Sequence, residues 1–231
     1  MLKILILLLA YNRPKMIRDT FDSINRSTYK NFQVALIDDG SLIPMESIAK
    51  EVLGPEEFSK TIVYRIDDSK EDKLRRGGSI IGDYMNKAMK ELGCDLAIFL
   101  CDDDLLLPDY LENLNKYFTA NPDVPYAYSH VRIFNDGEDP YSVEKRPYWL
   151  NKTETIDPYC ALDASQVCWR VPKAVEGEIW FPVPKTANLD ADFYGPFCEK
   201  YGPCRFLGSD GELKRQHEHQ LGLTSSMDNV D

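Results

Sequence analysis

The sequence predicts a single α/β domain built around a mostly parallel central sheet. Apolar runs typical of buried strands alternate, along the first half of the chain, with segments whose apolar residues repeat at helical spacing. Asp-rich turns follow two of these runs. In an open α/β sheet the carboxyl ends of the strands form the edge where ligands bind, so these turns predict a binding site at that edge.

The expected elements follow in chain order. Residues 4–9 form an unbroken apolar run, typical of a strand covered on both faces, and Pro14 is placed to open a helix. The second helix is expected to stop at Gly54-Pro55. Further strands are expected at 34–37, 62–66, 96–100 and 126–134, and further helices through 48–52, at 79–92, from 108 to 118 and, less regularly, at 189–201.

No linker divides the chain, so we expect one domain over residues 1–223, with a regular half to residue 110 and a less regular half from 111. Residues 135–159 are polar and lack periodicity; they fit a long loop over a site, a mobile segment or an acceptor-binding insertion. The polar tail, 224–231, is expected to be frayed.

Composition limits the function. The 231 residues include 27 Lys and Arg and 38 Asp and Glu, a formal net charge of −11, which disfavours a nucleic acid partner because such binders need a basic surface. A small anion can still bind at a local site or through a metal.

Six cysteines form no CxxC pair, and no apolar run is long enough to span a bilayer. We therefore expect a cytoplasmic protein with reduced thiols and no transmembrane segment.

Three consecutive aspartates, Asp102 to Asp104, end a predicted buried strand. Like charges this close destabilise one another unless a cation neutralises them, and carboxylates suit Mg²⁺ or Mn²⁺ bridging to phosphate oxygens. The alternative is a solvated turn that caps the next helix. Because Asp38-Asp39 ends a neighbouring strand, the pattern favours a metal–diphosphate site, and the excess of acid predicts metal dependence.

Other polar residues have two interpretations each. Asp39 could accept a hydrogen bond from the imide N–H of a pyrimidine base, or serve only as a turn residue. Arg75-Arg76 could reach diphosphate oxygens or be a solvated loop. His217 and His219 could supply a further Mn²⁺ ligand or be exposed tail residues.

Together these motifs resemble family 2 glycosyltransferases of the GT-A fold, over roughly residues 3 to 222. The order of the motifs carries the resemblance: Tyr11-Asn12-Arg13-Pro14, Asp38-Asp39-Gly40-Ser41, Asn86, Asp102-Asp103-Asp104 through Pro108, and Leu189-Asp190-Ala191-Asp192-Phe193. Within the family the chain most resembles the spore coat polysaccharide glycosyltransferases, which share the Asp163 to Arg170 pattern.

The resemblance implies a Rossmann-like, nucleotide-diphospho-sugar transferase domain, with a nucleotide-sugar-binding half at 1–110 and an acceptor-binding half at 111–223. It implies Asp190 as the general base, with Asp192 as the next candidate, and Mn²⁺ or Mg²⁺ as the cofactor. The implied metal ligands are Asp103, then Asp104, and His217 or else His219. The residues implied to bind the nucleotide sugar are Ala10, Tyr11, Arg13, Asp39, Arg76, Asn86 and Asp102.

The implied reaction is inverting transfer of a sugar from a UDP- or dTDP-sugar to the hydroxyl of a glycan or other acceptor, in polysaccharide or glycan synthesis. Three positions depart from the family pattern: Cys101 replaces a common Asp, Leu189 replaces a common Glu, and Arg76 is displaced. Two alternatives stay open: a nucleotidyltransferase, although residues 10–14 lack its usual Gly-rich loop, and an inactive nucleotide-sugar-binding module.

Overall fold

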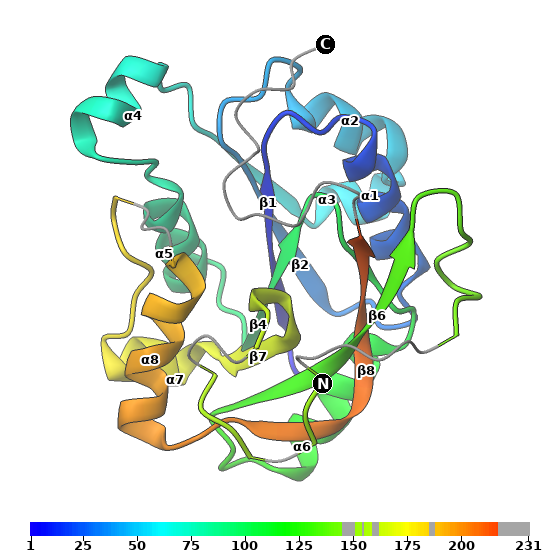
Figure 1. The fold of residues 1–231 in the computed structure, drawn as a ribbon, viewed down its shortest axis with the longest axis vertical. Coiled ribbons are helices and arrows are strands. Elements are labelled where there is room, and N and C mark those ends of the chain that lie inside the picture. The colour runs from blue at the N-terminus through cyan, green and yellow to red at the C-terminus, as the bar shows by residue number, and fades with distance from the viewer. Residues whose placement is uncertain (145–150, 154, 159–161, 185–187, 217–231) are drawn as a thin grey trace.

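The structure is a computed structural model, and it describes residues 1–144, 151–153, 155–158, 162–184 and 188–216. One eight-stranded sheet runs through it in the order β3-β2-β1-β4-β7-β6-β8-β5 (Figure 1). The expected single α/β fold with a mostly parallel sheet is confirmed, since four of its neighbouring strand pairs are parallel: β1 with β2, β1 with β4, β2 with β3, and β6 with β8.

The parallel half of the sheet positions the site. β1 (Ile4–Ala10) lies between β2 (Phe32–Asp38) and β4 (Leu96–Cys101), and β3 (Thr61–Arg65) lies outside β2. The chain moves outward from β1 to β2 and β3, then crosses back to the other side of β1 to form β4. The strand order therefore reverses at β1 and β4, and a ligand crevice is expected at their carboxyl ends.

Helices cover both faces of the sheet, which is why β1 is apolar at every position (Figure 1). Residues Ile4, Ile6 and Leu8 belong to one core cluster, whereas Leu5 and Leu7 belong to the other. The first cluster includes α1 (Met16–Arg26), α2 (Met45–Val52) and α6 (Tyr110–Ala120), with α3 (Pro55–Ser59) close by; the second includes α5 (Ile81–Glu91), α7 (Val171–Gly177) and α8 (Leu189–Tyr201).

The second half extends the sheet with mixed pairing. β7 (Val167–Arg170) pairs antiparallel with β4 and with β6 (Tyr126–Asn135). The long β8 (Arg205–Gln216) runs parallel to β6 and antiparallel to the two-residue β5 (Leu105–Leu106). β8 therefore brings the last described residues of the chain back beside the turn that follows β4.

The structure differs from the expected elements in three ways. The second helix ends at Val52, just before Gly54-Pro55 as expected, but the separate short helix α3 was not expected; Pro55 is its first residue, a position where the missing N–H costs nothing. The helix α4 (Lys70–Arg76) was not expected, since it has no apolar face. β8 was also not expected, because its glycines and charged residues give no alternating pattern. The tail at 224–231 lies outside the described residues.

None of the described helices combines the length and apolar character needed to cross a bilayer. Five of the six cysteines are described, and all five are free thiols: Cys94, Cys101, Cys168, Cys198 and Cys204. The expectation of unpaired thiols is confirmed for these five.

Arg170, at the end of β7, supports the junction between the two halves. Its Nη2 donates to the carbonyl oxygens of Phe118 (2.7 Å) and Asn121 (3.1 Å), and its Nε donates to that of Val124 (2.9 Å). The carbonyls of Phe118 and Asn121 lie at the end of α6, where helical partners are missing, and Val124 follows in the connection to β6. A single side chain thus ties α6 to the sheet.

We expect Arg170→Met to lower the free energy of unfolding by about 2 to 3 kcal/mol, because it leaves these carbonyls without their charged donor. The measurement is urea unfolding, with the exposed Arg26→Met as the matched control, expected to change stability by less than about 0.5 kcal/mol. Equal stability of the two variants would show that Arg170 does not support this junction.

Candidate functional site

The carboxyl ends of β1, β2 and β4 bring three loops together: residues 11–13, residues 39–41 and the acidic turn, which we define as Asp102 to Asp104. The loops are bonded directly to one another. The Tyr11 N–H donates to Asp102 Oδ2 (2.8 Å), and the Asn12 N–H donates to Ser41 Oγ (3.0 Å). The sequence predicts that the residues after these three strands lie at the same edge of the sheet, and the structure places them there.

Two side chains of helix α1 hold the backbone of the acidic turn through hydrogen bonds. The Thr20 hydroxyl donates to the carbonyl oxygens of Asp102 (3.1 Å) and Asp104 (2.9 Å), and Ser23 Oγ accepts the N–H of Leu106 (3.1 Å). Both α1 side chains are fully buried. Two polar side chains on an otherwise apolar helix face thus hold the backbone of the acidic turn in place. The three aspartate side chains start from this fixed backbone.

Asp102 holds the loop after β1 through both of its carboxylate oxygens. Its Oδ2 accepts from Tyr11, and its Oδ1 lies 3.1 Å from Arg13 Nη1. The side chain is almost fully buried, and this burial raises its pKa to about 6, although the Arg13 guanidinium opposes the shift. Both carboxyl oxygens are therefore used within the protein.

Asp104 fastens β8 in the same way. Its Oδ1 accepts the backbone N–H of Arg215 (3.2 Å), and its Oδ2 lies 3.4 Å from Lys214 Nζ. Lys214 also pairs with Asp163 at 2.9 Å. The sequence resemblance did not point to Lys214, since no helical or strand pattern placed β8 beside the acidic turn.

Beneath Asp104 lies Glu212, a fully buried carboxyl group on β8. No N–H group or hydroxyl of the described residues bonds to either oxygen, and the hydrogen-bonding neighbour of this carboxyl group is that of Asp104. Burial raises its pKa well above the usual range, and the neighbouring Asp104 carboxyl raises it further. The two neighbouring carboxyl groups therefore favour a shared proton, which lowers the negative charge beneath the turn.

Asp103 lies between these two anchored carboxylates. Its Oδ2 is 2.8 Å from Arg13 Nη1, so one guanidinium nitrogen bridges Asp102 and Asp103. Ligand atoms of Cys101, Asp103 and Asp104 lie within 4.8 Å of one another. The two carboxylates suit Mn²⁺ or Mg²⁺, whereas burial raises the pKa of the Cys101 thiol, and a thiol is a ligand for softer metals, so the fit rests on Asp103 and Asp104 alone.

The two aspartates after β2 differ in environment. Asp38 is buried and accepts from the N–H groups of Ser41 (2.8 Å) and Met45 (3.1 Å), while Arg65 pairs with it at 2.8 Å. It therefore shapes the turn and the start of α2. Asp39 is more exposed, and its Oδ1 accepts from Ser79 Oγ (2.7 Å) and lies 3.1 Å from Lys73 Nζ.

Asp190 lies in the first turn of α8, where the helix dipole stabilises a carboxylate. The phenol of Tyr194 donates to the carbonyl of Ala164 (2.8 Å). Burial raises the pKa of Tyr194 well above its usual range, and the charges of Asp190 and Asp163 add to this shift. Asp190 and Asp163 thus both act on Tyr194, and Asp163 pairs with Lys214 beside the acidic turn.

The remaining predicted residues lie as follows. Ala10 is buried at the end of β1, and its carbonyl accepts the Asp39 N–H (2.9 Å). Arg76, in the last turn of α4, pairs with Asp68. The Asn86 amide makes two hydrogen bonds to the backbone of Phe181 (3.0 and 2.9 Å), so it anchors that segment on α5. His217 and His219 lie outside the described residues.

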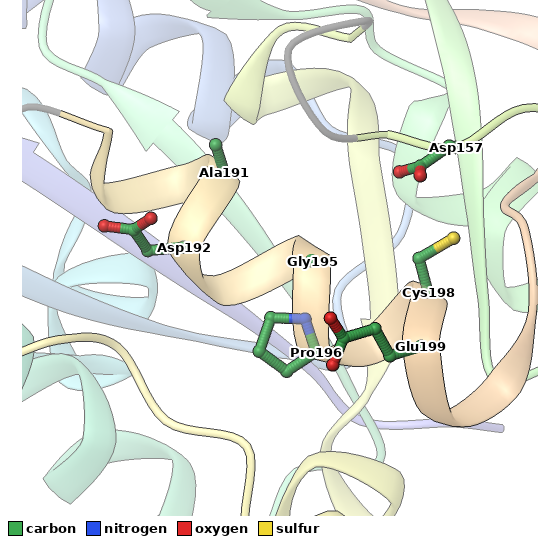
Figure 2. A pocket seen from close by; sticks show the side chains of 7 residues that line it. All are labelled: Asp157, Ala191, Asp192, Gly195, Pro196, Cys198 and Glu199. Atoms are coloured by element: carbon green, nitrogen blue, oxygen red, sulfur yellow. The ribbon is translucent and has the colours of Figure 1, made fainter.

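A separate hollow of about 700 Å³ lies along α8, as Figure 2 shows. Asp157 and α8 residues that include Ala191, Asp192 and Glu199 line it. None of the residues predicted to bind the nucleotide sugar lines this hollow, and neither does Asp190. Asp190 and Asp192 therefore differ in surroundings although they share a helix turn.

The buried Glu212 predicts a pH dependence of stability. Because its pKa is higher in the folded than in the unfolded chain, the folded protein binds the extra proton, and stability falls as pH rises from about 4 through the folded pKa. We expect Glu212→Gln to be more stable than the natural protein by at least about 1 kcal/mol at pH 8, with the difference narrowing toward pH 4.

Urea unfolding at several pH values measures this difference, and the exposed Glu91→Gln serves as the matched control that should leave the pH slope unchanged. An identical pH slope in Glu212→Gln and the natural protein would contradict a proton held on Glu212.

The chain was compared with known proteins. The sequence profile of the family described as "Glycosyl transferase family 2" matches residues 5–171. "Glycosyltransferase GlyA" of Streptococcus pneumoniae is 26% identical over 136 residues; the match covers 59% of this chain and 18% of GlyA. The chain thus spans less than a fifth of that relative.

Solved structures show the same fold at low identity. S. aureus TarS in complex with UDP-GlcNAc has a TM-score of 0.67 at 16% identity, over 97% of this chain and 61% of that one. The mannosyltransferase PcManGT from Pyrobaculum calidifontis, in complex with GDP-Man and Mn²⁺, has a TM-score of 0.61 at 14% identity, over 95% of this chain and 58% of that one.

The profile match covers most of the chain and includes all three strand ends that form the site, together with the acidic turn. The chain belongs to glycosyltransferase family 2.

Proposed function

We propose that this protein transfers a sugar, with inversion, from a UDP- or dTDP-sugar to an acceptor hydroxyl, with the help of Mn²⁺ or Mg²⁺. The observation that carries the proposal is the meeting of Tyr11, Asp39 and Asp103 at the carboxyl ends of three parallel strands, where the strand order reverses. Open α/β sheets bind nucleotides at this position. Membership of the family supports the same reaction class.

The base of the nucleotide is assigned to Tyr11 and Asp39. The Tyr11 side chain is about half exposed (50%), which leaves a ring face for stacking. A carboxylate such as Asp39 accepts the imide N–H of uracil or thymine. Ala10 contributes backbone beside the base, and Asp102 faces the ribose or donor sugar while it holds the loop that carries Tyr11.

The diphosphate is assigned to Arg13 and Arg76, whose guanidinium groups match phosphate geometry. Arg13 already lies against the acidic turn, whereas Arg76 is paired with Asp68 on the exposed helix α4. Asn86 acts by holding the segment around Phe181 next to α5. These roles complete the nucleotide-sugar-binding half at residues 1–110.

For the metal, Asp103 is the first ligand, as the resemblance to the family implies, and its carboxylate lies within 4.8 Å of ligand atoms of Cys101 and Asp104. Asp104 is the second choice and His217 a further ligand. When bound, Mn²⁺ or Mg²⁺ would stabilise the charge of the departing diphosphate. PcManGT, the structural neighbour described with GDP-Man and Mn²⁺, supports this cofactor.

Asp190 is the general base. Its carboxylate accepts the proton of the acceptor hydroxyl, the hydroxyl oxygen forms a bond to the anomeric carbon, and the bond from that carbon to the diphosphate oxygen breaks. Asp190 lies in the first turn of α8, at the positive end of the helix dipole. Such positioned proton transfer contributes on the order of 10²- to 10⁴-fold to the rate.

The acceptor is a glycan or another hydroxyl compound, bound by the half at residues 111–223, in polysaccharide or glycan synthesis. The UDP-GlcNAc and UDP complexes of TarS support a uridine donor. The five free cysteines support action in the reducing cytoplasm.

We expect Asp190→Asn to lower turnover by about 10²- to 10⁴-fold while UDP affinity changes less than about twofold, because the amide cannot accept the proton. The assay follows nucleoside diphosphate released from UDP- and dTDP-sugars, with affinity from calorimetry. Asp192→Asn, on the same helix turn but beside the outer hollow, is the matched control.

Unchanged turnover in Asp190→Asn would contradict the assignment of the base, and loss confined to Asp192→Asn would move it to that residue. Release of pyrophosphate from a nucleoside triphosphate instead of nucleoside diphosphate from a donor sugar would identify a nucleotidyltransferase. Binding of UDP without any release from the donor would identify an inactive binding module.

A further inference from the structure

We propose that Lys73 is an internal competitor for the nucleotide base, and that binding of the base breaks the contact between the middle of helix α4 and the strand ends while Arg76, at the end of α4, stays beside the site. The inference rests on the proposed function, since it takes Tyr11 and Asp39 as the site of the base. It adds a residue that the family resemblance did not indicate and a movement that follows from its position.

The ammonium group of Lys73 occupies the acceptors that the base requires. Lys73 Nζ donates to the backbone carbonyl of Asp39 at 2.8 Å and lies 3.1 Å from its Oδ1. The same Oδ1 accepts from the Ser79 hydroxyl at 2.7 Å. An imide N–H that approaches Asp39 therefore meets an Oδ1 that already has two donors, so it bonds to Oδ2 beside the Lys73 ammonium or displaces one of the donors.

Lys73 also occupies the stacking position. Its Nζ lies over the Tyr11 ring, 5.2 Å from the ring centroid. Stacked or offset aromatic rings have centroids about 4.5 to 7 Å apart, so the ammonium lies within the space that a stacked base would fill. The base and the Lys73 ammonium cannot share this ring face, so the two contacts of Lys73 are lost together.

Helix α4 has few other attachments. None of its residues whose exposure is described is buried, and Leu74 is 73% exposed. The Arg76–Asp68 pair joins the helix to the segment just before it, and Arg75 pairs with Asp72 within the helix. In Figure 1, α4 projects from the domain beyond α5. Lys73 is thus the contact that joins the middle of α4 to the strand ends.

The helix also ends where the backbone can turn freely. Gly77 and Gly78 follow α4 with φ values of +80° and +157°. A left-handed residue of this kind ends the helix at no steric cost, and no atom lies within 4 Å of the position that a Cβ of Gly77 would take. Release of Lys73 therefore allows α4 to move without disturbing α5.

An ion pair and a cation–π contact at such partly exposed positions are individually weak, so a nucleoside can displace them. We expect Lys73→Met, which keeps the aliphatic stem, to bind uridine or thymidine about three- to twentyfold more tightly than the natural protein. Uncharged nucleosides are the probes because they report on the base site without any contribution from phosphate or metal.

The experiment titrates uridine and thymidine into the natural protein, Lys73→Met and the control Lys90→Met by calorimetry. Lys90 is matched because it lies over another aromatic ring, that of Trp180 at 4.2 Å. Its removal should leave nucleoside affinity unchanged. Hydrogen exchange of residues 70–76 is the second readout: uridine should speed exchange in the natural protein, and Lys73→Met alone should show the faster rate.

Tighter binding by Lys73→Met together with faster exchange in α4 supports the inference. Binding that is equal or weaker in Lys73→Met, or exchange that slows when uridine binds, would overturn it and leave the proposed function standing. If neither nucleoside binds to the natural protein or to Lys73→Met, the base site itself is wrong, and the inference falls with that part of the proposed function.

Discussion

Buried carboxylates must be neutralised, and this requirement organises the whole site. The aspartates at the strand ends are each paired with a cation that comes from elsewhere in the chain: Arg65 for Asp38, Lys73 for Asp39, Arg13 for Asp102 and Asp103, and Lys214 for Asp104. An unpaired buried carboxylate would cost several kcal/mol, roughly, so these pairs also fix where the loops lie. The acidic turn is therefore a junction as well as a binding site.

Three adjacent aspartates have three different attachments. Asp102 holds the loop that carries Tyr11, Asp104 holds the strand β8 that ends the described chain, and Asp103 lies between them against Arg13. Under the proposed function, Asp103 holds the metal. Because of these separate attachments, loss of Asp102 or Asp104 would disturb the base loop or β8, so inactive variants at these two positions would not by themselves identify metal ligands.

Much of the first half could be predicted from the sequence, because strands buried on both faces and amphipathic helices leave strong apolar patterns, as at 4–9 and 79–92. The meeting of Tyr11, Asp39 and the acidic turn followed from their places at strand ends. β8 could not be predicted, since its glycines and charged residues break any alternation, and so the partners of Asp104 were missed. The net charge predicted metal dependence, but it could not reveal that Arg13 and Lys214 pair with the acidic turn.

The central claim is that Asp103, and not its neighbours, joins the metal to the nucleotide. Calorimetric titration of UDP into the natural protein, Asp103→Asn and Asp102→Asn, each with Mn²⁺ and with chelator, tests it most directly. The account predicts that Mn²⁺ strengthens UDP binding at least about tenfold in the natural protein and in folded Asp102→Asn, and that this gain disappears in Asp103→Asn. UDP affinity indifferent to Mn²⁺ in the natural protein, or a full metal effect in Asp103→Asn, would contradict it.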